Sequence, residues 1–207
     1  MKPMKMKTKA SVSILSAMAA LLLCSSLTGC QSGGKDAFQM VICTPEVQAQ
    51  AADQYSQALL DNVDSLSGKE ISVQAVRTGK ESVDPTGYAA SIMKISTMVA
   101  SKELDLVVMD TDNARESAKG SIFMPLSEAF TQEELAGFED RLMSYDETND
   151  EGDSTGNKVA YGIDISHIPL VTDNLEEGTY GVFIIRNAQE LDAAKEALLY
   201  LANSAQN

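Results

Sequence analysis

Apolar positions in the first half of the chain alternate between two spacings. Residues 37–43, "AFQMVIC", are largely apolar and predict a strand, whereas apolar residues from Val47 to Leu66 recur every three or four positions and predict a helix. Thr44 and Pro45 are expected to begin that helix as N-cap and first-turn residues. The same patterns predict a second strand over 70–76, a second helix over 88–99 and a third strand over 106–109.

This order of strand, helix, strand, helix and strand predicts the α/β class. Right-handed crossovers place the third strand beside the first and the second strand on its other side. We therefore expect a single doubly wound lobe with a mostly parallel sheet flanked by helices.

The second half of the chain gives weaker patterns. Thr131 and Glu134 form a capping box that predicts a helix through about Phe138. The stretch 144–158 has almost no apolar residue and is interpreted as a loop. Strands are expected over 159–165 and 180–186, followed by a last helix capped by Asn187 and Glu190.

The chain begins with the layout of a secretory signal. A lysine-rich start precedes an apolar run over 10–23, which is short for a membrane span. "LTGC" follows at 27–30 and resembles the lipobox of bacterial lipoproteins. The resemblance implies lipidation at Cys30, with 1–29 as a removed signal peptide, 30–36 as a lipidated tether and 37–207 as one domain. It also implies an extracytoplasmic protein anchored to the bacterial cell membrane by lipid.

Charge and cysteine content narrow the choice of partners. The chain has 16 basic and 30 acidic residues, and loss of the four signal lysines shifts the net charge from −14 to −18. Such a balance argues against a nucleic-acid partner and against electrostatic adsorption to anionic lipid. Cys43 would be the only cysteine left besides Cys30, and its apolar surroundings predict a buried, unreactive thiol.

Polar residues follow two of the predicted strands. Asp110, Thr111, Asp112 and Asn113 end the third strand, and "RTGK" at 77–80 follows the second. Because ligands of open α/β sheets bind at the carboxyl ends of the strands, these residues are candidate ligand contacts. The set is Arg77, Lys80, Asp110, Thr111, Asp112 and Asn113, with Asp112 or Asn113 also expected as a helix N-cap and Asp110 facing the edge.

Catalytic and metal-binding alternatives fit the sequence less well. An aspartate-nucleophile phosphohydrolase also has D-x-D after an apolar strand, but its motif opens the fold and has Thr or Val where this chain has Ala114. The acidic loop fails an EF-hand register because Lys158 falls where a bidentate Glu is needed. His167, the single histidine, is interpreted as a surface residue. We expect no catalytic residue, metal site or cofactor.

Four segments resemble a known family. "LDLVVMDTDNA", "GSIFMPLSEAF", "YGIDI" and "YGVFIIRNAQELDAAKEALLYLAN" are similar to segments of the extracellular solute-binding proteins of sugar-type ABC importers, and they cover most of 104–203. The resemblance implies one lobe of a type II periplasmic binding protein. It also implies non-catalytic binding of a small solute and a link to an ABC permease.

The chain departs from that family in one large respect. Family members have two lobes around the ligand, but here only the loop at 166–179 stands where the second lobe would be inserted. The chain also contains no Trp to stack on a sugar. Two functions therefore stay open: solute binding, or a structural or protein-interaction module that keeps the lobe without a small ligand of its own.

Overall fold

The computed structural model describes residues 37–149 and 153–204. The expected signal peptide, Cys30 and the tether lie outside these residues. The described elements are β1 (Phe38–Thr44), α2 (Ala51–Asn62), η1 (Asp64–Leu66), β2 (Ile71–Arg77), α3 (Pro85–Ala100), β3 (Leu106–Asp110), α4 (Thr111–Lys119), α5 (Leu126–Ala129), α6 (Gln132–Leu135), η2 (Glu139–Arg141), β4 (Leu142–Thr148), β5 (Ser154–Asp164), α7 (Pro169–Thr172), β6 (Tyr180–Ile184) and α8 (Leu191–Asn203).

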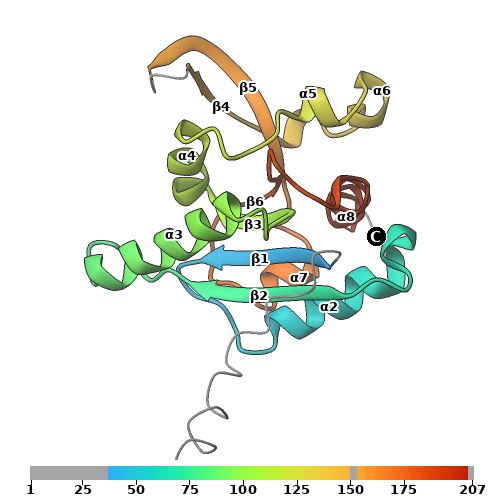
Figure 1. Cartoon of the computed structure of the whole chain (residues 1–207), viewed down its shortest axis with the longest axis horizontal. Helices are drawn as coiled ribbons and strands as arrows, with labels where there is room; N and C mark the ends of the chain where they lie inside the picture. The colour runs from blue at the N-terminus through green and yellow to red at the C-terminus, as the bar shows by residue number, and fades with distance from the viewer. Residues whose placement is uncertain (1–36, 150–152, 205–207) are drawn as a thin grey trace, which may run out of the picture. The chain divides into compact units, whose positions relative to one another are not determined.

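The strands form one open six-stranded sheet in the order β2-β1-β3-β6-β5-β4 (Figure 1). β1 pairs in parallel with β2 and β3, so the predicted placement of the first three strands is confirmed. The remaining pairings, β3 with β6, β6 with β5 and β5 with β4, are antiparallel. The sheet is thus mixed, although β1, β2, β3 and β5 all point the same way.

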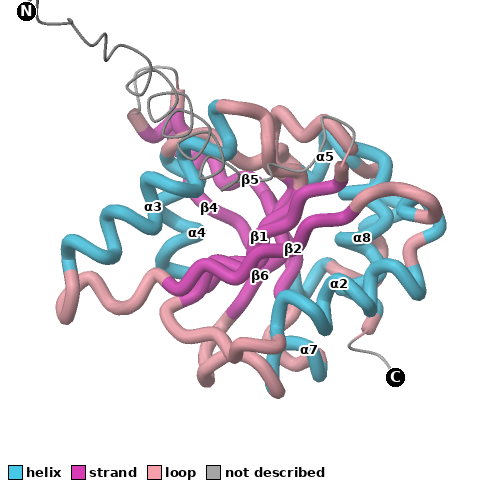
Figure 2. Tube along the Cα trace, turned by 60° about the horizontal axis from the view of Figure 1, so that its bottom comes forward, coloured by secondary structure: helices cyan, strands magenta, loops and turns pink. Residues whose placement is uncertain are grey.

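Helices cover both faces of the sheet, which confirms the α/β class. On β1, Met40 and Ile42 point to a core shared with α2 and α8, while Val41 and Cys43 point to a second core shared with α3 and α4. Figure 2 shows the two layers of helices on opposite sides of the strands. The alternation explains why β1 and β3 are apolar nearly throughout: each of their faces is buried against a helix layer.

The first helix begins later than the sequence predicts. Thr44 is the last residue of β1, not an N-cap, and its hydroxyl donates to the carbonyl oxygen of Glu46 at 3.0 Å. Val47 then forms an isolated bridge with Leu175, which holds the chain extended. Because Val47 is held in this bridge, helix α2 starts only at Ala51. Tyr55 is one of the residues on its buried face.

Residues 144–148 and 154–158 are strands and not a loop, so the loop prediction is wrong there. β4 and β5 pair as an antiparallel hairpin. Polar cross-strand contacts support the pairing, including the ammonium of Lys158 at 2.9 Å from a carboxylate oxygen of Asp146. The strands are polar here because much of the hairpin is exposed to solvent.

The two predicted caps of the second half have different outcomes. The capping box of Thr131 and Glu134 is confirmed, but α6 ends at Leu135 and does not reach Phe138. Neither Asn187 nor Glu190 caps α8 with its side chain. Buried Asp105 accepts the N–H groups of Gln189 and Glu190 instead, at 2.7 and 2.9 Å, while the Asn187 amide donates to Val99.

No helix within the described ranges is long and apolar enough to cross a membrane.

Candidate functional site

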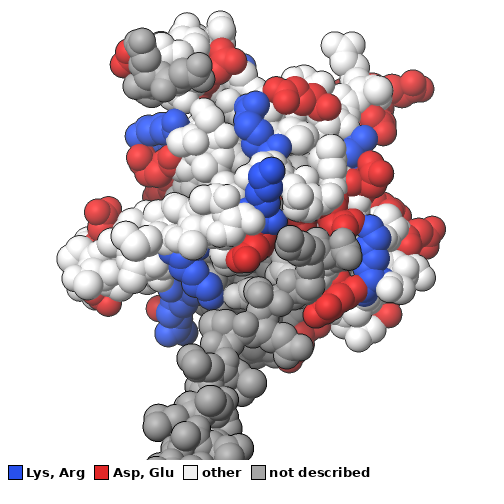
Figure 3. All heavy atoms as spheres, in the orientation of Figure 1, with Lys and Arg blue, Asp and Glu red and all other residues white. Residues whose placement is uncertain are grey.

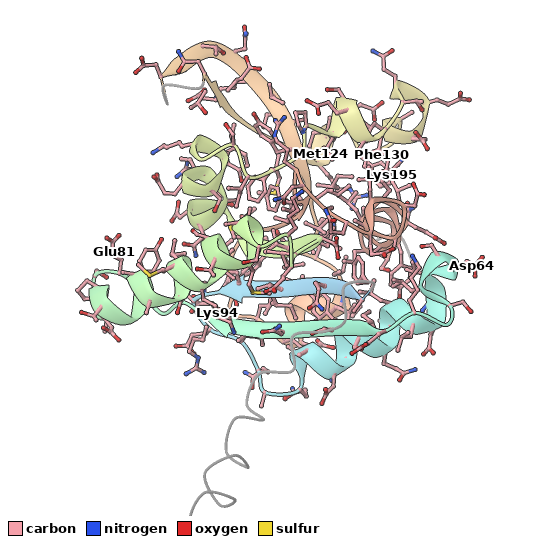
Figure 4. The ribbon with its side chains drawn as sticks, in the orientation of Figure 1. Asp64, Glu81, Lys94, Met124, Phe130 and Lys195 are labelled. Carbon is pink, nitrogen blue, oxygen red and sulfur yellow. The ribbon has the colours of Figure 1, made fainter. Side chains whose placement is uncertain are left out.

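A pocket of about 670 Å³ lies at the edge of the sheet where β1, β2 and β3 end. Its walls are the loop after β2, the start of α4 and the loop before β6. Figure 4 shows Glu81, one of the lining residues, beyond the arrowheads of β1 and β2. This is the edge at which the sequence predicts ligand contacts.

Asp110 lines the pocket and is also the N-cap of α4. One carboxylate oxygen accepts the backbone N–H groups of Asp112 and Asn113, at 3.1 and 3.0 Å. The other accepts the side-chain amide of Asn113 at 2.5 Å. The prediction that Asp112 or Asn113 caps the helix is therefore wrong, because β3 runs directly into α4 and Asp110 itself is the N-cap.

Asn113 joins two helices beneath the pocket. It is buried, with 4% of its surface exposed, and its carbonyl oxygen accepts the Tyr88 hydroxyl of α3 at 2.7 Å. Burial raises the pKa of Tyr88, and the nearby carboxylates of Glu81 and Asp110 raise it further. Tyr88 is therefore a neutral hydrogen-bonding group in the pocket wall at physiological pH.

The opposite wall is fixed by contacts between α4 and the loop before β6. The backbone N–H and the hydroxyl of Thr111 both donate to the carbonyl oxygen of Thr179, at 3.1 and 3.2 Å. The Tyr180 hydroxyl donates to the carbonyl oxygen of Glu176 at 3.0 Å. Burial and the Glu176 carboxylate raise the pKa of Tyr180 to about 12, so this phenol also stays neutral.

The structure brings together five of the six predicted ligand contacts: Lys80, Asp110, Thr111, Asp112 and Asn113 all line the pocket. Arg77 does not line it, because its guanidinium turns to the carboxylate of Glu46 at 2.8 Å. Arg77 thus forms an exposed ion pair on β2 outside the pocket, and its role as a ligand contact stays a prediction.

Sequence reasoning missed the acidic wall supplied by the segment before β6. Glu176, Glu177 and Thr179 line the pocket because β6 runs antiparallel to β3 and so begins at the edge where β3 ends. Neighbouring apolar strands are visible in the sequence, but their relative direction is not. Had the last strand been predicted to run antiparallel to β3, the segment before it would have been expected at this edge.

The pocket is strongly acidic. Five carboxylates line it against the single ammonium group of Lys80, which lies 3.9 Å from the carboxylate of Glu176. Such a lining attracts cationic groups and provides acceptors for hydroxyl groups. The acids in the lining are Glu81, Asp110, Asp112, Glu176 and Glu177.

A second hollow, of about 340 Å³, shares Thr111 and Thr179 with the acidic pocket. Its lining includes Arg115 of α4 and the hairpin residues Tyr145, Asp146 and Lys158. Two cations therefore face one carboxylate here, in contrast to the acidic pocket. The guanidinium of Arg115 lies 2.9 Å from a carboxylate oxygen of Asp112, which links the linings of the two hollows.

Two other residues considered from the sequence lie where it predicts. Cys43 is fully buried, and burial, reinforced by the Asp110 carboxylate, raises the pKa of its thiol to about 12. His167 is exposed and lies outside both hollows. Among the residues that the structure describes, no three His, Cys, Asp or Glu side chains are grouped to hold a metal ion.

Comparisons with family models, with curated proteins and with solved structures found no match to this chain.

Proposed function

We propose that the chain is an extracytoplasmic lipoprotein, anchored through Cys30, whose single lobe binds a small solute without catalysis. The observation that carries the proposal is the pocket at the carboxyl edge, which gathers five candidate residues from two separate segments. Its volume of about 670 Å³ suits a small molecule, since such sites typically measure about 300–1,000 Å³.

The lining of the pocket supports binding more than chemistry. Asp110 has its oxygens engaged by the first turn of α4, and Asn113 is held between Asp110 and Tyr88. Groups fixed in this way present a rigid pattern of acceptors and donors, which favours recognition of a ligand. Resemblance to one lobe of type II periplasmic binding proteins adds an ABC permease as the proposed recipient of the solute.

A ligand screen tests the binding proposal. The lobe from about residue 37 would be screened against a library of amines, amino acids, sugars and organic acids by thermal shift, because a ligand that binds only the folded state raises its melting temperature. Asp112→Asn, in the pocket lining, should weaken the response, whereas Glu103→Gln, exposed and outside the pocket, should not. A library without any binder, or binders indifferent to Asp112→Asn, would contradict the proposal.

The anchor is tested separately. Cys30→Ser in the full chain should abolish acyl labelling and move the protein from the membrane fraction to the soluble fraction. Cys43→Ser is the matched control. Because Cys43 is buried in the sheet, the variant should still carry the acyl label on Cys30. A Cys30→Ser protein that still carries label and remains with the membrane would refute the anchor.

Helix α3 supports a second candidate function, a protein-interaction module. Its sequence over 85–100 contains no acidic residue although the chain is strongly acidic, and Figure 3 shows mostly uncharged surface along it. Met93 is 69% exposed on this helix and Val83, just before it, is 80% exposed. A photo-crosslinking residue at 93 should then give a discrete adduct in intact cells, and one at 103 should not.

A further inference from the structure

We infer that the acidic pocket and the second hollow form one cleft for an elongated zwitterionic solute. The cationic group of the solute lies among the carboxylates, and its anionic group lies against Arg115 and Tyr145. This inference rests on the proposed solute-binding function and names the ligand class that the cleft accepts.

The two hollows lie on either side of one contact in the fold. Thr111 and Thr179 line both of them, and two hydrogen bonds join these residues. A solute that extends across the Thr111–Thr179 contact therefore touches both linings. The combined cleft takes its walls from α4, from the loop before β6 and from the hairpin of β4 and β5.

The linings differ in charge along the cleft. The pocket has five carboxylates against Lys80, whereas the second hollow has Arg115 and Lys158 against Asp146 alone. The potential therefore becomes less negative from one end of the cleft to the other. A solute with an amine at one end and a carboxylate at the other matches this gradient in a single orientation.

Tyr145 gives an independent reason to expect an acceptor in the second hollow. Its side chain lines this hollow and is 7% exposed, and its hydroxyl has no hydrogen-bond partner among the described residues. Buried polar groups are nearly always satisfied, so an unpartnered phenol in a cleft wall needs an explanation. The hydroxyl is itself shielded from solvent, so a small movement of the lining would let a carboxylate of the solute accept the hydrogen bond that the protein leaves unmade.

Charged groups from both linings influence Tyr145. Burial raises the pKa of Tyr145 to about 12, Arg115 opposes that rise, and the carboxylates of Asp110 and Asp112 add to it. The phenol is therefore a neutral donor at physiological pH. It stands near Arg115, whose guanidinium bonds Asp112 through one nitrogen and has further N–H donors for an anion.

Four probes of matched length separate the possible ligand classes. They are 6-aminohexanoate, which is zwitterionic, hexane-1,6-diamine, hexylamine and hexanoate, each titrated into the wild-type lobe by calorimetry. We expect 6-aminohexanoate to bind at least about tenfold more tightly than any other, because a hydrogen bond to a charged group contributes about 1.5–3 kcal/mol. Raising the salt concentration should weaken its binding.

Tyr145→Phe tests the role of the unpartnered hydroxyl. It should weaken binding of 6-aminohexanoate about tenfold and leave hexylamine unaffected, because it removes only the donor to the carboxylate. The thermal stability of the variant should be unchanged or higher, since a buried unsatisfied group is lost. Tyr161→Phe, on the same hairpin but outside both hollows, is the matched control and should bind like wild type.

The outcomes distinguish this inference from the function on which it rests. Equal binding of the diamine and 6-aminohexanoate, or full affinity in Tyr145→Phe, overturns the zwitterion assignment. If the library yields a binder sensitive to Asp112→Asn while 6-aminohexanoate fails to bind, solute binding stands and this inference fails. If neither the library nor the four probes bind, both fail.

Discussion

The two halves of the sheet are stabilised by different interactions. The parallel half, β2, β1 and β3, is joined by helices, and its central strands β1 and β3 are buried on both faces. At the other end, β4 and the first part of β5 form a hairpin held largely by exposed polar contacts. Both halves contribute to the cleft, so one wall is supported by a packed core and the other by contacts that water weakens.

This contrast predicts that substitutions in the buried half cost far more than those in the hairpin. Asp105 is the sharpest case, because it is 2% exposed and accepts three backbone N–H groups, those of Gln39, Gln189 and Glu190. Asp105→Ala would leave all three donors without this acceptor, the Gln39 N–H in a buried position, and should destabilise the lobe by about 3–5 kcal/mol. Urea unfolding measures the loss.

Glu103→Ala is the control for Asp105, because Glu103 lies two residues away and is exposed. It should change the free energy of unfolding by less than about 0.5 kcal/mol. If both variants lost a similar free energy of unfolding, the hydrogen bonds of Asp105 to β1 and to the start of α8 would not be the source of stability.

The next effect is expected at the cap of α4. Asp110→Ala removes the acceptor of two backbone N–H groups and should cost about 0.5–2 kcal/mol, the usual range for an N-cap. Asp110→Asn keeps an acceptor and should recover most of the loss. Urea unfolding of both variants checks the assignment, and an Asp110→Asn protein as unstable as Asp110→Ala would mean that the carboxylate charge matters more than the cap.

A smaller, pH-dependent effect is expected in the hairpin. Hydrogen bonds from the Thr155 hydroxyl and then the Asn157 amide lower the pKa of Glu147 from its ordinary value of 4.5. A lowered folded-state pKa means that the contribution is present above pH 4.5 and lost as the pH falls through the folded value. Hairpin resonances followed by NMR should shift on acidification below pH 4.5, and Glu147→Gln should remove that component.

The smallest effect is expected at the ion pair of Lys158 with Asp146. Both side chains are more than 60% exposed, at 68% and 63%, so solvent screens the attraction. Lys158→Ala should change stability by less than about 1 kcal/mol, and salt should reduce the difference further. Thermal unfolding at low and high salt measures it. A loss as large as that in Asp105→Ala would erase the distinction between the two halves.

The same contrast explains how much the sequence predicts. β1 and β3 are predicted correctly because strands buried on both faces must be apolar nearly throughout. β4 and the start of β5 are missed because strands exposed to solvent need no apolar alternation, and a run such as 144–158 then looks like a loop.

The sequence likewise predicts some features of the site and misses others. Its location follows from rules for open α/β sheets, so Lys80 and Asp110 are placed at the correct edge. The exact cap is missed because β3 passes into α4 without an intervening loop, so the cap lies two or three residues earlier than predicted. The direction of Arg77 is missed because a local ion pair with Glu46 decides it, and the sequence pattern does not show that pair.

The position of Asp110 has a consequence for how occupancy of the cleft could be observed. Because one carboxylate both caps the first turn of α4 and lines the pocket, a cationic ligand that binds Asp110 competes with the amides of Asp112 and Asn113. Hydrogen exchange of these two amides should then accelerate when the ligand binds. A ligand held only by Glu176 and Glu177 would leave both exchange rates unchanged, so the backbone at the start of α4 reports which carboxylates the ligand uses.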